Sequence, residues 1–89
     1  MNLLSVGFGN PVAVSRILAV VSADAAPTKR MIQAARDGNT VIDATAGRKT
    51  RAVLVMDTGH VVLSALQPET LSARLTDDEI ILREAAHED

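Results

Sequence analysis

The residues with the clearest chemical potential are three cations within four positions, Arg48, Lys49 and Arg51. The segment that holds them contains no acid, so their charges repel one another unless an anion binds there. Arginine gives phosphate two parallel hydrogen bonds, and lysine gives it a point charge. A fourth cation, Arg16, stands among apolar residues and must reach solvent at an edge or meet a partner. The pattern fits a phosphate-binding surface or an ordinary solvated face.

The net charge of the 89-residue chain is −2, which at first argues against a nucleic-acid partner. That average hides an asymmetry. Residues 1–67 hold seven basic and four acidic side chains, a net charge of +3, whereas residues 68–89 hold two basic and seven acidic ones, a net charge of −5. The chain therefore has a basic body that can face an anionic partner and an acidic end.

None of the other polar groups forms a persuasive catalytic site. The run GFGN at residues 7–10 lacks the third glycine and the following helix of a phosphate-binding loop. We expect it to form a turn in which Phe8 anchors the core. His60 has no serine or cysteine companion in a recognisable arrangement, and Asp43 is expected to bind backbone or an arginine. The sequence predicts neither an enzyme nor a cofactor.

Composition excludes several further classes of protein. With 47% apolar and 22% charged residues, the chain is not intrinsically disordered. It has no cysteine, and His60 and His87 lie far apart, which argues against disulfide scaffolds and metal sites. Phe8 is the only aromatic residue, so a stacking platform for single-stranded nucleic acid is missing. Without a membrane-spanning run or a signal-peptide pattern, we expect a cytoplasmic protein.

The expected elements form one domain over residues 1–75, with an acidic, helical or partly frayed tail at 76–89. Residues 12–15 and 17–21 read as extended, with Arg16 between them. A helix is predicted for 27–37, with an N-cap at 22–24 and Gly38 as its left-handed stop. Its buried stripe follows helical spacing and comprises Thr28, Met31, Ile32 and Ala35.

The second half of the domain predicts a three-stranded antiparallel meander at 40–45, 50–56 and 61–66. Gly47 and Gly59 stand third in four-residue turns, as type II turns require. Lys49 and Arg51 then share one side of a strand, with Arg48 at a hairpin tip. The predicted class is α+β, with a five-stranded, mostly antiparallel sheet, one central helix and a short C-terminal helical segment.

Two strands of this meander are apolar without alternation, at residues 52–56 and 61–63. A sheet with one wet face alternates, so a continuous run indicates that both faces are covered. One helix cannot cover both faces of a five-stranded sheet. The second cover is therefore either the C-terminal helical segment or another subunit.

The sequence resembles the RemA-type extracellular matrix regulatory protein family over residues 3 to about 75. The segments that carry the resemblance are VGFGN at 6–10, APTKRMI at 26–32, IDAT at 42–45 and GRKTRAV at 47–53, followed by 55–57, 60–61, 63–65 and 67–70. Their collinear order makes the match specific. The acidic end carries no part of it.

The resemblance implies a bacterial, nucleoid-associated, DNA-binding transcriptional regulator of extracellular matrix and biofilm genes. It implies a homo-oligomeric ring of seven or eight subunits with double-stranded DNA around its outside, bound in a manner compared with LytTR-type domains. The DNA-contacting positions of the family match Arg16, Arg48 and Lys49, and Arg51 belongs to the same motif. Two residues depart from the family pattern: Ala46 replaces an aromatic residue and Lys49 an arginine.

A second function from a different class stays open. The continuous apolar strands are also compatible with a structural or protein-interaction module that binds a partner protein without specific affinity for DNA. The two functions differ in whether removal of Arg48 changes DNA affinity.

Overall fold

The computed structural model describes residues 2–75 and shows a small α+β protein. Its elements are β1 (Leu3–Ser5), β2 (Pro11–Ala13), the 3₁₀ turn η1 (Val14–Arg16), β3 (Ile17–Ser22), α1 (Ala26–Asp37), β4 (Val41–Asp43), β5 (Ala52–Met56) and β6 (Val61–Ser64), followed by helical residues 68–75. The acidic tail expected at 76–89 lies outside the described residues.

The strands form two sheets, where the sequence predicted one sheet of five strands. β1 and β2 pair only with each other, and a four-stranded sheet has the order β3-β5-β6-β4. β4 runs parallel to β6 and does not pair with β5, so the predicted antiparallel meander is wrong in its first pairing. The reason lies in polarity, because the apolar β5 takes the centre of the sheet, while β4, with Asp43 and an exposed Ile42, takes an edge.

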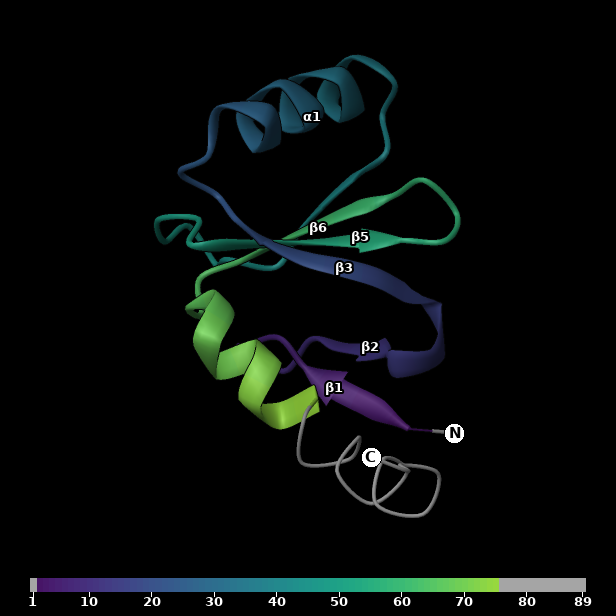
Figure 1. The fold of residues 1–89 in the computed structure, drawn as a ribbon, viewed down its shortest axis with the longest axis vertical. Coiled ribbons are helices and arrows are strands. Elements are labelled where there is room, and N and C mark those ends of the chain that lie inside the picture. Colours follow the sequence, from purple (N-terminus) through teal and green to yellow (C-terminus); the bar gives the residue numbers. More distant parts are fainter. Residues whose placement is uncertain (1, 76–89) are drawn as a thin grey trace, which may run out of the picture.

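Helix α1 covers one face of the four-stranded sheet with the predicted stripe (Figure 1). Thr28 and Ala35 are buried, and Met31 and Ile32 pack against the core of that face. That core comprises Ala23, Ala35, Val53, Val61 and Leu63. The helical stripe is therefore confirmed.

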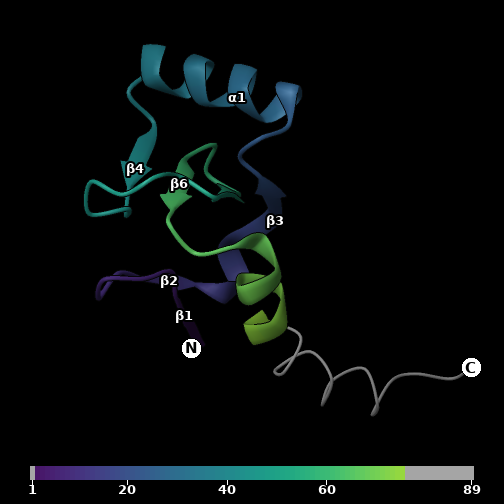
Figure 2. The ribbon, with the colours of Figure 1, turned by 90° about the vertical axis from the view of Figure 1, so that its left-hand side faces the viewer.

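The opposite face is covered by the β1–β2 hairpin and by helical residues 68–75 (Figures 1 and 2). Leu4, Val6 and Leu71 pack there against Leu54 and Val62. Both faces of β5 and β6 are thus covered within one chain, as the continuous apolar runs required. Of the two expected covers, the C-terminal helical segment is the one observed, and the N-terminal hairpin, which the sequence did not predict as a cover, joins it.

The ends of α1 use other residues than the sequence predicted. The N-cap is Ala25, which makes no side-chain capping bond, while Ser22 Oγ accepts a bond from the Asp24 amide at 3.2 Å. At the other end, Gly38 keeps a φ of −94° and Asn39 adopts the left-handed φ of 59°. The amide of Thr40 donates to Ala35 O at 2.9 Å, which closes a Schellman motif around Asn39.

Candidate nucleic-acid interface

The basic loop, defined here as residues 44–51, is fixed at both ends and carries three of the four predicted site residues. At its start, the Ala44 amide donates to Leu63 O at 2.9 Å, and at its end the Arg51 amide donates to Ser64 O at 2.8 Å. The side chains of Arg48, Lys49 and Arg51 are exposed. The loop therefore presents three cations from a backbone that the sheet holds at both ends.

Asp43 and Thr45 stabilise the first turn of this loop. One oxygen of Asp43, Oδ1, accepts bonds from the Thr45 amide at 2.9 Å and from Thr45 Oγ1 at 2.6 Å. These bonds, the side-chain one first, lower the pKa of Asp43 below its ordinary value of 3.8, with a smaller contribution from the charge of Arg36. Asp43 thus binds backbone, which is one of the two partners that the sequence predicted, and it also binds the Thr45 hydroxyl.

The tip of the basic loop is a left-handed turn and not a hairpin tip. Ala46 and Gly47 have φ values of 54° and 79°, and the Arg48 amide donates to Thr45 O at 3.0 Å. Two consecutive positive φ angles belong to the type I′ class and not to the predicted type II turn. Residues 48–51 precede the strand, so the expected alternation of Lys49 and Arg51 does not apply.

Phe8 lies beside Arg48 at the tip of the β1–β2 hairpin. The guanidinium carbon of Arg48 sits 5.3 Å from the centroid of the Phe8 ring, within the range of a cation–π contact. Phe8 is 52% exposed, so the prediction that it anchors the core is wrong. In Figure 2 the hairpin tip and the basic loop project to the same side of the molecule.

The turn at residues 7–10 explains why the ring points outward. The Asn10 amide donates to Gly7 O at 3.1 Å, and the Asn10 side chain donates to Gly7 O and Phe8 O at 3.0 and 3.3 Å. Phe8 and Gly9 both have positive φ, which matches a two-residue hairpin turn. The sequence did not predict that Phe8 lies beside Arg48, although its place as the single aromatic between two turn glycines was a usable signal.

Arg16 lies at the end of η1 and not in a strand. Its side chain reaches solvent and also meets a partner, which are the two outcomes that the sequence left open. Its side chain is 64% exposed, and its Nη1 donates to Asp57 Oδ2 at 3.1 Å. The Asp57 amide also donates to Arg16 O at 2.8 Å. This double connection fixes η1 against the turn between β5 and β6.

The structure therefore divides the four predicted site residues between two places. The basic loop leads into β5, whereas Asp57, which holds Arg16, directly follows the last residue of β5. At 3.3 Å per residue, the backbone of Arg51 and that of Asp57 lie roughly 20 Å apart. Figure 1 shows the basic loop and the β5–β6 turn at opposite ends of the strand. One chain therefore carries two separate basic places.

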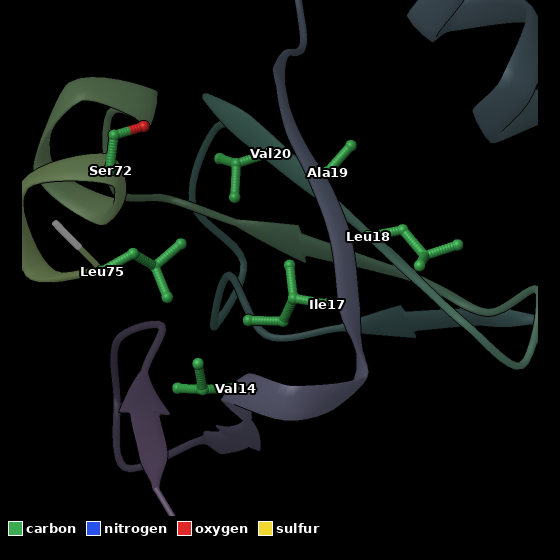
Figure 3. Close-up of a pocket in the computed structure, with 7 residues that line it drawn as sticks. All are labelled: Val14, Ile17, Leu18, Ala19, Val20, Ser72 and Leu75. Carbon is green, nitrogen blue, oxygen red and sulfur yellow. The ribbon is translucent and has the colours of Figure 1, made fainter. Parts of the chain in front are cut away.

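An open cleft of ≈ 340 Å³ lies along the edge strand β3 (Figure 3). It is lined by Val14, Ile17, Leu18, Ala19, Val20, Ser72 and Leu75. A bulge between Ile17 and Ala19 leaves Leu18 unpaired with β5 and 69% exposed. Among residues 2–75, the side chains that line the cleft are apolar except for the hydroxyl of Ser72.

Within residues 2–75, no group of three or more His, Asp or Glu side chains is placed to hold a metal ion. In the same part of the chain, no helix is long and apolar enough to cross a membrane.

A family model described as "Extracellular matrix regulatory protein A-like" matches residues 3–75. The chain belongs to the RemA-like family. A relative from Dictyoglomus turgidum, named "Putative regulatory protein", is 60% identical over 75 residues, which cover 84% of this chain and 88% of the relative. Relatives from Bacillus cytotoxicus and Bacillus mycoides bear names of the same form and are 55% identical over 84 residues, 94% of this chain and 97% of theirs. The matched region of this RemA-like chain contains the basic loop, Phe8 and Arg16.

Proposed function

We propose that this RemA-like protein is a bacterial transcriptional regulator that binds double-stranded DNA and controls extracellular matrix and biofilm genes. The observation that carries DNA binding is the basic loop, whose three exposed cations are presented by a backbone hydrogen-bonded to β6 at both ends. Each phosphate that these cations neutralise releases condensed counterions, and a backbone that is already held lowers the entropy that binding costs. The names of the relatives support the regulatory role.

The two basic places suit a duplex better than a small anion. Arg16 and the basic loop are separated by the length of β5, and a duplex carries one charge per ≈ 1.7 Å of its axis, so roughly a dozen phosphates fall within that span. A nucleotide or a free phosphate cannot reach both. The protein therefore acts in the cytoplasm at the nucleoid, where duplex DNA is present.

Self-association multiplies these contacts, since three or four phosphate contacts from one subunit bind weakly at physiological salt. The strands β3 and β4 form the two edges of the four-stranded sheet. Each edge exposes a large apolar residue, Leu18 at 69% and Ile42 at 49%. Contact between the β3 edge of one copy and the β4 edge of the next is heterologous, and such contacts close a ring when the rotation permits. We expect a ring of seven or eight subunits with the basic places on its rim.

The experiment that tests this function is the electrophoretic mobility of a long duplex at several salt concentrations, with the native mass of the protein measured in parallel. The proposal predicts a retarded complex that weakens steeply with salt and a mass of several subunits. A monomer that leaves the duplex unshifted at low salt contradicts it.

The second candidate function is a protein-interaction module, which the apolar cleft beside Leu18 favours. In that case DNA affinity is weak, nonspecific and insensitive to Arg48→Ala, while Leu18→Asp abolishes capture of the partner protein.

A further inference from the structure

Phe8 is costly to the fold in two ways. Its φ of 56° lies in the left-handed region, which a bulky side chain rarely adopts. Its ring, the single aromatic ring of the chain, is 52% exposed to water even with Arg48 over it. Glycine at this position removes both costs, and glycine already stands on either side. The hydrophobic core gains little from Phe8, so a functional role of this residue must depend on its exposed surface.

What Phe8 contacts at that surface is the guanidinium of Arg48. The two side chains come from turns that lie 40 positions apart along the chain, and both turns are held rigidly. The hairpin that carries Phe8 is fixed by the buried Ser64, whose Oγ donates to Val6 O at 2.8 Å. The Arg48 turn is fixed by the bonds between Asp43 and Thr45. The pair is thus preorganised, which lowers the entropy that binding costs.

We propose that Phe8 is a DNA-contacting residue of this protein, which binds beside Arg48. The inference rests on the proposed function and adds an apolar, aromatic residue to its cationic DNA-binding residues. Arg48 binds a phosphate beside the ring, and the exposed surface of the ring makes its own contact with the deoxyribose and base edges of the adjacent minor groove. Apolar side chains in that groove contact sugars and widen base steps, which favours DNA that bends around the protein.

In this arrangement the Phe8 ring contributes to DNA affinity in a way that salt does not screen. Contacts of Arg48 and Lys49 with phosphate weaken as salt displaces them. Burial of the Phe8 ring depends on apolar area and persists at high salt. The two components are therefore separable by measuring DNA affinity over a salt series.

The test uses the full-length protein and a long duplex, with Phe8→Ala, Phe8→Gly and Arg48→Ala compared with the native chain. Phe8→Ala and Phe8→Gly are expected to weaken binding about tenfold per contacting site, as removal of the ring and its cation–π pair predicts, with the salt slope unchanged. Phe8→Tyr, which keeps the ring, is expected to bind as the native chain does. The thermal midpoint of Phe8→Gly is expected to stay equal or rise, which a structural role for the ring does not allow.

Leu3→Ala is the matched control, because it removes a 57% exposed apolar side chain from the same hairpin, away from its tip. It is expected to leave affinity unchanged. Native-like binding by Phe8→Ala alongside weakened Arg48→Ala overturns the inference and leaves the proposed function standing. Weaker binding by Phe8→Ala with the reduced salt slope of Arg48→Ala also overturns it, since the ring then only supports the arginine. Absence of binding by the native chain rejects the proposed function itself.

Discussion

Nη1 of Arg16 lies 3.1 Å from Oδ2 of Asp57, and the pair joins the 3₁₀ turn η1 to the β5–β6 turn. The arginine side chain is 64% exposed and the aspartate 33%. Exposed ion pairs contribute about 0–1 kcal/mol to stability, so this one is readily exchanged. A phosphate can replace the carboxylate of Asp57 while the backbone bond between the Asp57 amide and Arg16 O stays in place. Asp57 thus keeps Arg16 in place and competes with its proposed ligand.

Asp57→Asn is expected to raise DNA affinity up to about fivefold per contacting site, because the guanidinium no longer has to leave a carboxylate. Fluorescence anisotropy with a labelled duplex measures this. The free energy of unfolding is expected to change by less than about 1 kcal/mol. Arg16→Ala serves as the control and is expected to weaken binding strongly. Weaker binding by Asp57→Asn would contradict this prediction, because it would show that DNA binding requires the intact ion pair between Arg16 and Asp57.

The basic loop allows a test of side-chain geometry at constant charge. Lys49→Arg restores a planar fork that can hold phosphate by two bonds, so we expect tighter binding with an unchanged salt slope. Arg48→Ala is expected to weaken binding and to reduce the slope of log K against log salt by about 0.9 for each phosphate that the protein no longer neutralises. A salt titration of both variants measures these changes. Equal affinities for Lys49→Arg and the native chain would place Lys49 outside the DNA-binding surface.

Ser64 is expected to be important for the stability of the hairpin that carries Phe8. Its buried Oγ donates to Val6 O at 2.8 Å and accepts from the Leu66 amide at 3.1 Å. Ser64→Ala leaves both groups without that partner, which costs about 1–3 kcal/mol in the free energy of unfolding, measured by urea titration. Ser72→Ala, at an exposed helical position, is the control and is expected to change it by less than about 0.5 kcal/mol. Equal effects of the two substitutions would contradict this assignment.

Acid is expected to loosen the first turn of the basic loop. The pKa of Asp43 is lowered in the folded protein by its bonds with Thr45, so the folded state favours the ionised carboxyl. This contribution is present above the unfolded pKa of about 3.8 and is lost as the pH falls through the folded value. Urea midpoints measured from about pH 5 to about pH 2 should therefore fall less steeply for Thr45→Val than for the native chain. Parallel curves would show that Asp43 does not contribute.

Periodicity in the sequence was sufficient to predict the elements with regular patterns. The stripe of Thr28 and Ala35 predicted the helix and its buried face, and the apolar runs predicted two strands covered on both sides. Strand order was not predictable in this way. The parallel pairing of β4 with β6 depends on which strand tolerates an edge, a property of the assembled sheet and not of any one segment.

The candidate site was predictable in its residue types and not in its arrangement. The clustered charges identified the basic loop in the sequence. The left-handed conformation of Ala46 was not predicted, and with it residues 48–51 form a loop and not part of a strand. The contact between Phe8 and Arg48 depends on the hairpin packing as a separate layer, which local patterns do not encode. Arg16 was expected to reach solvent at an edge or to meet a partner, and its side chain does both. Its distance from Arg48 followed only from the position of β5.

The central claim is that the basic loop and Arg16 bind duplex DNA through phosphate. Its most direct test is a salt titration of duplex affinity for the native chain and for the double variant Arg16→Ala/Arg48→Ala, with native mass confirming equal assembly. We expect steep salt dependence for the native chain, and weak binding with a shallower slope for the variant. Equal affinity and equal slope for the two proteins would contradict the account.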